Sequence, residues 1–298
     1  MRRSSDERII DIQWATKRYP DLQPYLEIHR GVIEAQDALR RSAKKGTLGD
    51  WDERTLRKLQ SKAQEAQQPL IRYLKLSMID EEEMRTVAIQ IVDVLIQHKT
   101  QGSLEALRQK LTSGVLRIRD LLGVVSEGID GEIVKIARTM QVEQRLLVFL
   151  AHMLIQPWAE RVASDIDRSF LDRWAQSVCP VCGVKPVVER TIGGKRFLSC
   201  TLCSLRFPAD PFLCVFCGNS DPYTLKSLVP DDNPAQRVDY CEKCRRYTKV
   251  IVKQRLKEEL PLWLEDLLTL DLDFMAKSAD LVRDWPDGAT PTEAQQVW

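Results

Sequence analysis

The sequence predicts an α+β, multi-module protein: an all-helical N-terminal domain, two tandem rubredoxin-like or zinc-ribbon knuckles, and a short helical C-terminal tail. Apolar residues recur at three- and four-residue intervals through the first half of the chain, which is the spacing of helices packed on a core. Eight cysteines then follow, and helical patterning returns after them. The expected domains are residues 1–176 (helical), 177–212 (first knuckle), 213–255 (second knuckle) and 256–298 (a helical and then frayed tail).

Two long amphipathic helices are expected in the first half of the helical domain. Pro24 suits the first turn of a helix, and the apolar residues after it keep helical spacing. Asp80 precedes three glutamates, and acidic side chains in a first turn interact favourably with the helix dipole. The expected buried stripes are Tyr25, Ile28, Val32, Ala35 and Leu39 in the first helix, and Met84, Val87, Ile91, Val94 and Leu95 in the second.

Further helices complete this domain. Two shorter ones are expected over residues 103–112 and 114–126, and Asp130 is a candidate cap for the next. The last helical segment runs from about residue 142 to residue 163. Because Pro157 within it removes a backbone donor, we expect a kink or a break there.

Short strands are expected beside the cysteines. The region from residue 179 to about 253 alternates glycine, proline and cysteine with β-forming residues. Gly193-Gly194 is typical of a hairpin turn. The region also has the form of a loose tandem duplication, with two copies of a unit that contains two cysteine pairs. The expected strands lie within PVVER, RFLSC, VDYC and YTKVIV.

The eight cysteines form four Cys-x-x-Cys pairs, separated by gaps of 17, 10 and 23 residues. Two cysteines with two residues between them can present both sulfurs to one ion, and two such turns complete a tetrahedral site. Gaps of 17 and 23 residues fit a β-hairpin with one turn at each base. We therefore expect the first pair to join the second and the third to join the fourth. The expected metal ligands are Cys179, Cys182, Cys200, Cys203, Cys214, Cys217, Cys241 and Cys244.

Several alternatives stay open for these sites. Interleaved ligation would join the first pair to the third and the second to the fourth. Sulfur ligands suit zinc or a rubredoxin-type single iron, and a cluster with bridging sulfide is a minor alternative. The two metal ions, iron or zinc, could also serve only to hold together a fold too small for a core of its own.

The residue after each pair bears on the geometry of the turn. Gly183 and Gly218 follow the first and third pairs, where glycine permits a positive φ that aims backbone N–H groups at the sulfurs. Ser204 and Arg245 occupy the same place after the second and fourth pairs. Those two turns are therefore expected to be less ideal.

Composition and hydropathy exclude several classes of protein. The net charge of +1, from 44 basic and 43 acidic residues, gives no general attraction to nucleic acid. The N-terminal residues lack the apolar region of a secretory signal, and the longest apolar stretch, LLVFLAHMLI, has about half of the roughly 20 residues that a membrane span requires. We expect a cytoplasmic protein without membrane insertion, and in that reducing compartment paired thiols indicate metal binding.

Neither nucleic-acid binding nor catalysis is favoured. Basic residues exceed acidic ones by only five over residues 179–253, and two divalent tetrathiolate centres, at about −2 each, would offset most of that excess. Arg245, Arg246, Lys249 and Lys253 cluster, which a solvated face explains. The sequence has no Ser/His/Asp order, phosphate-binding glycine loop or HExxH motif, so no catalytic or cofactor-binding residue is assigned and the chain is not expected to be an enzyme.

Segments along most of the chain resemble one family, the formate dehydrogenase accessory proteins called FdhE. The resemblance lies in CPVCG, RFLSCTLC, CVFCGNSDPYTL and RVDYCEKCRRYTK, in FLAHMLIQPWAE and PDLQPYLEIHRGVIEAQ before them, and in DLLTLDLDFMA after them. This sequence departs from the family at Ser204, where glycine is more usual, and residues 45–125 carry no match.

The resemblance implies a chaperone-like assembly factor that binds the immature catalytic subunit of formate dehydrogenase, an enzyme with molybdenum or tungsten and iron–sulfur clusters. It also implies rubredoxin-like iron rather than structural zinc alone. Arg245, Arg246 and Tyr247 are expected to project toward this partner, the alternative being a solvated strand edge. A rubredoxin-like redox carrier is an alternative function, and a zinc-ribbon nucleic-acid-binding protein is a less favoured one.

Overall fold

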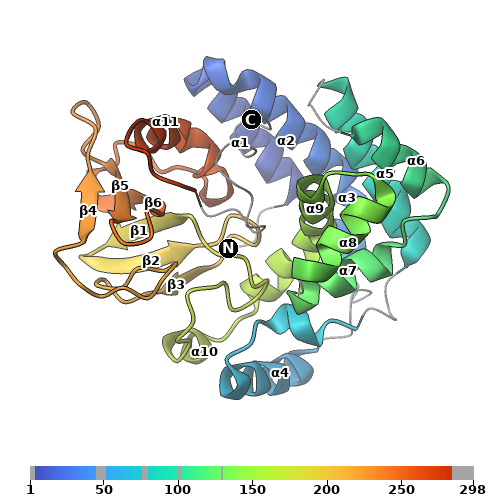
Figure 1. Ribbon diagram of the computed structural model, residues 1–298, viewed down its shortest axis with the longest axis horizontal. Coiled ribbons are helices and arrows are strands. Elements are labelled where there is room, and N and C mark those ends of the chain that lie inside the picture. The colour runs from blue at the N-terminus through green and yellow to red at the C-terminus, as the bar shows by residue number, and fades with distance from the viewer. Residues whose placement is uncertain (1–3, 45–51, 76–79, 99–102, 129, 284–298) are drawn as a thin grey trace. The chain divides into compact units, whose positions relative to one another are not determined.

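The chain divides into two compact units. The helical unit comprises the described residues up to Ala63 together with Leu70–Asp165, and the sheet unit comprises Gln64–Pro69 and the described residues from Ile166 onward. The tail expected to fray falls in residues 284–298, outside the described residues. The computed structural model in Figure 1 describes residues 4–44, 52–75, 80–98, 103–128 and 130–283.

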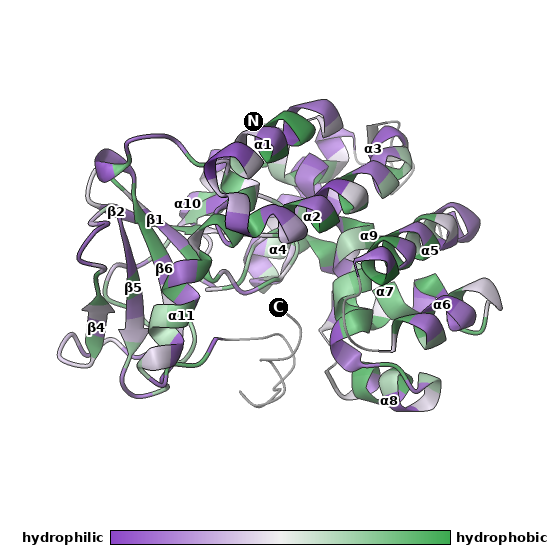
Figure 2. Cartoon of the chain, turned by 90° about the horizontal axis from the view of Figure 1, so that it is seen from above, coloured by the Kyte–Doolittle hydropathy of each residue, from purple (hydrophilic) through white to green (hydrophobic). Residues whose placement is uncertain are grey.

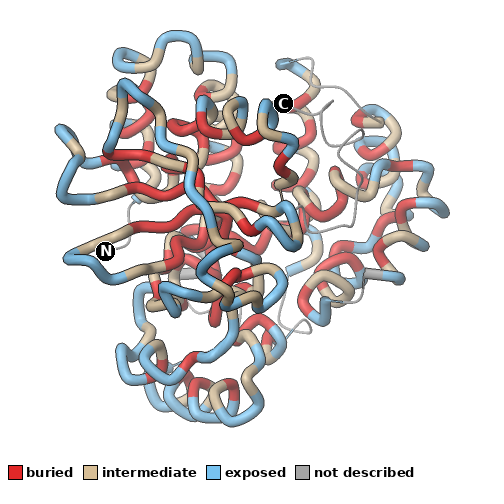
Figure 3. The backbone as a smooth tube through the Cα atoms, turned by 60° about the vertical axis from the view of Figure 1, so that its left-hand side comes forward, coloured by how far each residue is buried: buried red, intermediate tan, exposed pale blue. Residues whose placement is uncertain are grey.

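The helical unit is built around α9 (Gln144–Ser164), which packs against α3, α5, α7 and α8 (Figure 1). Buried residues occur on every side of α9, because neighbours surround it. Within each unit, buried residues follow the strands and one side of the helices, and many loop residues are exposed (Figure 3). The other helices are α1 (Ser5–Arg18), η1 (Pro20–Leu22), α2 (Gln23–Ala35), α3 (Asp37–Lys44), α4 (Glu53–Ala66), η2 (Leu70–Tyr73), α5 (Glu81–Gln97), α6 (Leu104–Thr112), α7 (Ile118–Glu127) and α8 (Asp130–Met140).

The start of α5 follows the prediction. The Asp80 carboxylate accepts hydrogen bonds from the backbone N–H groups of Glu82 and Glu83, at 3.1 and 3.0 Å, and so satisfies two of the free donors of the first turn. Figure 2 shows hydrophobic and hydrophilic residues interspersed along this helix. Of the predicted stripe, Met84, Val87, Ile91 and Leu95 are buried and Val94 is half-buried.

The helix after Pro24 differs from the prediction in its buried face. Val32 and Leu39 of the predicted stripe are buried, but Tyr25, Ile28 and Ala35 are only half-buried. Leu26 and Ile33, which were not predicted, are buried instead. The segment is also divided, because α2 ends at Ala35 and α3 begins one residue after Gln36. The side chain of Gln36 is fully buried and makes its hydrogen bonds to α9 and α3.

Gln36 supplies the hydrogen bond that Pro157 cannot make. In a regular helix the N–H of residue 157 would bind the carbonyl oxygen of Met153, but proline has no N–H. Gln36 Nε2 instead donates to Met153 O at 2.6 Å and to Gln156 Oε1 at 2.9 Å. The helix continues through Pro157, so the expected break is wrong, and the freed carbonyl is paired as a buried acceptor must be.

A buried carboxylate on α9 ties α1 and α3 to the same helix. Glu160 pairs with Arg8 Nη2 at 2.6 Å and with Arg40 Nη1, and all three side chains are almost completely buried. Burial lowers the pKa of Arg8 to about 10, against the opposing attraction of Glu160. Removing one member of such a group would leave a buried charge uncompensated, so these residues fix how the first helices pack on α9.

Both cysteine-containing segments contribute three strands to one six-stranded sheet, in the order β3-β2-β1-β6-β5-β4. Neighbouring strands are antiparallel except β1 and β6, which are parallel. The two segments repeat one order: a cysteine pair, a hairpin, a second pair and a single strand. The predicted fold class is therefore confirmed, with the two copies joined through β1 and β6. The strands are β1 (Val188–Ile192), β2 (Lys195–Ser199), β3 (Arg206–Pro208), β4 (Leu225–Leu228), β5 (Gln236–Cys241) and β6 (Tyr247–Val252).

The strands expected from the sequence are β1, β2, β5 and β6, and the short β3 and β4 were not expected. Gly193 and Gly194 form the β1–β2 turn with φ of 57° and 76°, as two-residue hairpin turns of this kind require. The pairing of Ile192 with Lys195 closes the hairpin around them.

Short helices follow the sheet and pack on its inner strands. α11 contacts β5 and β6, and Leu272 and Ala276 on that helix share an apolar cluster with Val238 and Tyr247. The expected helical tail is confirmed, although it consists of short pieces. The remaining helices of the sheet unit are α10 (Arg168–Asp172), η4 (Lys253–Arg255), η5 (Leu262–Leu264), η6 (Leu267–Thr269) and α11 (Leu270–Ser278). Among the described residues, no helix is long and apolar enough to cross a membrane.

The role of Gln36 gives a double-mutant test. Gln36→Met keeps the side-chain volume but leaves the Met153 carbonyl without a donor, so it should lower the free energy of unfolding of the helical unit by about 1–3 kcal/mol. Pro157→Ala restores the missing N–H and should recover part of that loss in the double variant. Urea unfolding followed by circular dichroism at 222 nm measures both effects. Strictly additive effects of the two substitutions would show that Gln36 does not replace the proline donor.

Candidate metal centres

All four Cys-x-x-Cys turns share one backbone conformation. The N–H of the residue after each pair donates to the carbonyl of the first cysteine at 2.8–2.9 Å, and the N–H of that first cysteine donates to the carbonyl five residues on, at 2.8–3.1 Å. The residue after each pair is left-handed in every turn. The φ values are 75° at Gly183, 59° at Ser204, 72° at Gly218 and 60° at Arg245.

Ser204 and Arg245 thus take the geometry of glycine, although a left-handed residue with a side chain costs about 1–2 kcal/mol. At Arg245 the C-terminal segment holds this conformation in place. The Arg245 carbonyl accepts from Val282 N at 2.8 Å, and its guanidinium donates to the carbonyls of Ala279 and Asp280 at 2.7 and 3.2 Å. The side chain of Arg245 is therefore engaged within the chain.

The first centre brings together the first two pairs. Cys179 Sγ lies 3.4 Å from Cys203 Sγ, and Cys182 Sγ lies 3.4 Å from Cys200 Sγ and 3.9 Å from Cys203 Sγ. All four side chains are buried. The first pair stands before β1 and the second follows β2, so the β1–β2 hairpin brings the two turns together.

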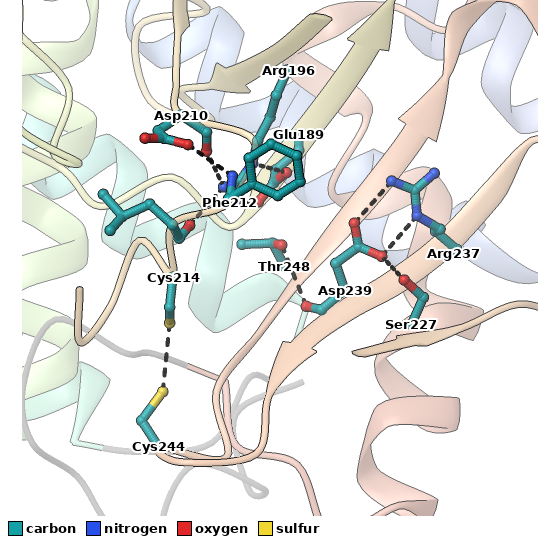
Figure 4. A network of polar contacts seen from close by, with 11 residues as sticks. Glu189, Arg196, Asp210, Phe212, Cys214, Ser227, Arg237, Asp239, Cys244 and Thr248 are labelled. Atoms are coloured by element: carbon teal, nitrogen blue, oxygen red, sulfur yellow. Dashed lines mark hydrogen bonds and ion pairs between the residues drawn. The ribbon is translucent and has the colours of Figure 1, made fainter. Parts of the chain in front are cut away.

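The second centre repeats this arrangement with the last two pairs. Cys214 Sγ lies 3.7 Å from Cys244 Sγ, and Cys217 Sγ lies 3.8 Å from Cys241 Sγ (Figure 4 shows the first of these contacts). Cys217 is exposed and Cys244 is half-buried. Since the pairs meet in sequential order in both centres, the sequential grouping is confirmed and the interleaved alternative is wrong.

The sulfur positions fit a tetrahedral ion. Metal–sulfur bonds of about 2.3 Å in a tetrahedral site place the sulfurs about 3.8 Å apart. The five separations given above are 3.4–3.9 Å, and all four sulfurs of each centre lie within 4.8 Å of one another. A disulfide would require about 2.05 Å, and all eight cysteines are free. The two groups can therefore each hold a soft divalent or trivalent ion, with iron and zinc equally compatible.

The polar surroundings of Cys241 in the second centre favour its thiolate, whereas burial raises the pKa of the Cys214 and Cys244 thiols of the same centre. Although burial raises the pKa of the Cys241 thiol, hydrogen bonds from the backbone N–H groups of Cys244 and Lys243 and from the Asn219 side chain lower it to about 7. A thiolate is the form that binds metal. The turn itself thus prepares this sulfur for ligation.

Asn219 is a residue near the second centre that the sequence did not single out. Its Nδ2 lies 3.4 Å from Cys241 Sγ and 2.8 Å from Thr224 Oγ1. Its Oδ1 accepts from Lys243 Nζ at 2.7 Å. The matching positions after the left-handed residues of the first centre are Val184 and Leu205. The fourth such residue, Arg246, is polar like Asn219, so the available signal was that polar residues follow the turns of the second centre alone.

Arg196 fixes the chain that leads into the second centre. From β2, its Nη1 donates to the carbonyls of Asp210 and Leu213 at 2.7 Å each, and its Nε donates to Glu189 at 2.6 Å (Figure 4). Leu213 directly precedes Cys214. Arg196, in the first copy of the repeat, therefore positions Cys214, the first ligand of the second centre. Its own position is held by the ion pair with Glu189, whose carboxylate is buried.

The expected solvated cluster after the last pair is wrong in part. Lys249 is completely buried and forms ion pairs of 2.6 Å with Asp266 and Asp273. Tyr247 is also buried, and its hydroxyl donates to Asp273 at 2.6 Å. Tyr247 therefore does not project toward a partner as expected, because its side chain is buried. The alternative of a solvated strand edge is also wrong for Tyr247, since β6 lies in the middle of the sheet between β1 and β5.

The partners of Lys249 come from the C-terminal segment. Arg283 pairs with the same two carboxylates, so two acidic and two basic groups balance one another. Against the opposing effect of burial, Arg283 and Lys249 hold the pKa of Asp266 well below its usual range. The acidic residues of the tail segment LEDLLTLDLD, which contains Asp266 and Asp273, were the available signal for this pairing, which holds the C-terminal helix on the sheet.

Comparison with known proteins gives one consistent result. A protein FdhE homolog from Shewanella baltica is 30% identical over 263 residues, covering 85% of this chain and 77% of that protein. An FdhE homolog from Aquifex aeolicus is 26% identical, covering 70% and 71%. The crystal structure of the FdhE protein from Pseudomonas aeruginosa matches the fold with a TM-score of 0.59 over 96% of both chains, at 17% identity. No protein-family model matches the chain.

We predict that the two centres bind metal independently. In the Cys179→Ser/Cys182→Ser variant, the purified chain should lose one equivalent of metal and retain about one, because the second centre shares no ligand with the first. Metal analysis by mass spectrometry measures this, and circular dichroism checks that the helices persist. Loss of both equivalents would refute independence, and retention of both would refute ligation by the first pair.

Proposed function

The chain belongs to the FdhE family, and from this membership we propose that it is an accessory factor in formate dehydrogenase assembly, which binds the immature catalytic subunit. The observation that carries the proposal is the pair of four-cysteine centres on one sheet, in a chain related to FdhE homologs over most of its length. Four rigid turns present backbone and side chains in a fixed arrangement, which is what recognition of another protein requires.

In this proposal each centre binds one ion through its four sulfurs. The first ion is held by Cys179, Cys182, Cys200 and Cys203, and the second by Cys214, Cys217, Cys241 and Cys244. Rubredoxin-type iron or zinc suits both centres, and either ion would stabilise a ribbon that has little core of its own. The two ribbons, residues 177–212 and 213–255, are proposed as separate modules within the common sheet, between the helical domain 1–176 and the tail 256–298.

The proposed place of action is the cytoplasm, where the reducing environment keeps the eight thiols available for metal. The chain acts by binding and does not itself oxidise formate. A rubredoxin-like carrier of electrons remains the second candidate, which the partly exposed second centre favours, since electron transfer requires a short path from the ion to the surface. A nucleic-acid-binding ribbon is disfavoured, because Lys249 of the expected basic cluster is buried.

The proposal is tested with the metal-loaded chain and the catalytic subunit of formate dehydrogenase. We expect the two to co-purify when the subunit is immature, and deletion of the chain from its host to lower formate dehydrogenase activity. Serine variants of either cysteine centre should lose the assembly activity. The control is Lys253→Ala, which changes an exposed residue that is not a cysteine and should keep the activity. Normal formate dehydrogenase activity after deletion, together with no binding of the subunit, would contradict the assembly function.

A further inference from the structure

We infer that the two centres have different functions: the first is a closed structural centre that retains its ion, and the second is a solvent-open centre that exchanges its ion, with Cys217 as the ligand that dissociates first. The inference rests on the proposal that both centres bind metal and does not require the assembly function.

The difference between the centres does not come from their turns. All four turns have the same backbone hydrogen bonds, and the residue after each pair is left-handed in all of them. The backbone of the turns is therefore equivalent in the two centres. A difference in the lifetime of the bound ions must therefore arise from what surrounds the sulfurs.

Burial separates the two centres. The four cysteines of the first centre are all buried, with exposed fractions of 0–5%, and apolar side chains such as Val181, Leu202 and Leu205 accompany them in the interior. In the second centre Cys217 is exposed and Cys244 is half-buried. Structural sites are characteristically closed to solvent, and a ligand in contact with water is the one that a competitor can reach.

The polar groups of the second centre are also distributed unevenly. Cys241 receives the side-chain hydrogen bond of Asn219, which Lys243 holds from the other side. Among the described residues, no side-chain nitrogen or oxygen donates a hydrogen bond to Cys217, whose sulfur contacts Cys241 Sγ. Hydrogen bonding stabilises a thiolate ligand and lowers its tendency to leave. Asn219 therefore acts as a positioning residue that retains Cys241 while Cys217 opens.

The exchange step needs no oxidant or reductant. Cys217 Sγ would leave a bound ion as its thiolate, and a donor atom of the incoming ligand would take its place. The released thiolate would accept the proton that an incoming thiol loses or, where the incoming ligand is a neutral imidazole, a proton from solvent. The other three sulfurs hold the ion meanwhile. A soft donor, such as a thiolate or an imidazole of a partner protein, is the class of ligand that would complete this exchange.

The test uses the full chain loaded with two equivalents of zinc and an excess of the chromogenic chelator 4-(2-pyridylazo)resorcinol. We expect two release phases of one equivalent each, with rates separated by about tenfold or more. Cys217→Ser should make the fast phase faster still, because the remaining three sulfurs then hold an ion whose fourth ligand is already lost, and should leave the slow phase unchanged. Asn219→Ala should accelerate only the fast phase, and Asn233→Ala, a change elsewhere in the sheet unit, should affect neither.

A second measurement does not depend on the variants. Brief treatment of the zinc-loaded chain with iodoacetamide, followed by peptide mass spectrometry, should find Cys217 alkylated before any cysteine of the first centre. The inference would be overturned if both equivalents of zinc were released at the same rate, or if the fast phase came from the first centre. Either result would leave the metal-binding proposal intact. A chain that cannot be loaded with two equivalents would contradict the metal-binding proposal itself, and the inference with it.

Discussion

The structure of the sheet unit depends on one backbone constraint, the left-handed residue that closes each Cys-x-x-Cys turn. This residue reverses the direction of the chain, so that both sulfurs of a pair face the same metal position. A hairpin then needs only to place one such turn at each base to gather four sulfurs within 4.8 Å of one another. Ser204 and Arg245 adopt the same left-handed backbone as the two glycines. The constraint of the turn therefore outweighs the usual preference of these residues for a negative φ.

Buried charge connects this metal-binding scaffold to the rest of the sheet unit. Lys249 in the central strand β6 is neutralised by Asp266 and Asp273 of the C-terminal segment, and Arg245 of the fourth turn is held by carbonyls of the same segment. The tail is thus bound at the sheet and at the second centre. On the other side, Arg196 of the first ribbon holds the chain entering the second. The centres have separate ligands but share this framework.

The parts of the fold that the sequence revealed are those governed by local chemistry. Ligand spacing identified both centres and their sequential grouping, Gly193-Gly194 marked a hairpin, and Asp80 marked a helix start. The parts it did not reveal depend on distant partners. The parallel pairing of β1 with β6 and the burial of Lys249 require residues far along the chain. The continuity of α9 through Pro157 depends on Gln36, which lies 117 residues before its acceptor Met153. No local pattern around Lys249 or Pro157 distinguishes these outcomes from a solvated lysine or a broken helix.

Two separate four-sulfur metal centres are the feature on which every proposed function of this chain rests. X-ray absorption spectroscopy of the full chain, purified without oxygen, tests them most directly, because the extended fine structure reports the number, type and distance of the ligands. We expect two metal ions per chain, each with four sulfur neighbours at about 2.3 Å and no metal–metal scattering. Nitrogen or oxygen in the first coordination shell, or a metal–metal distance typical of a sulfide-bridged cluster, would contradict this assignment.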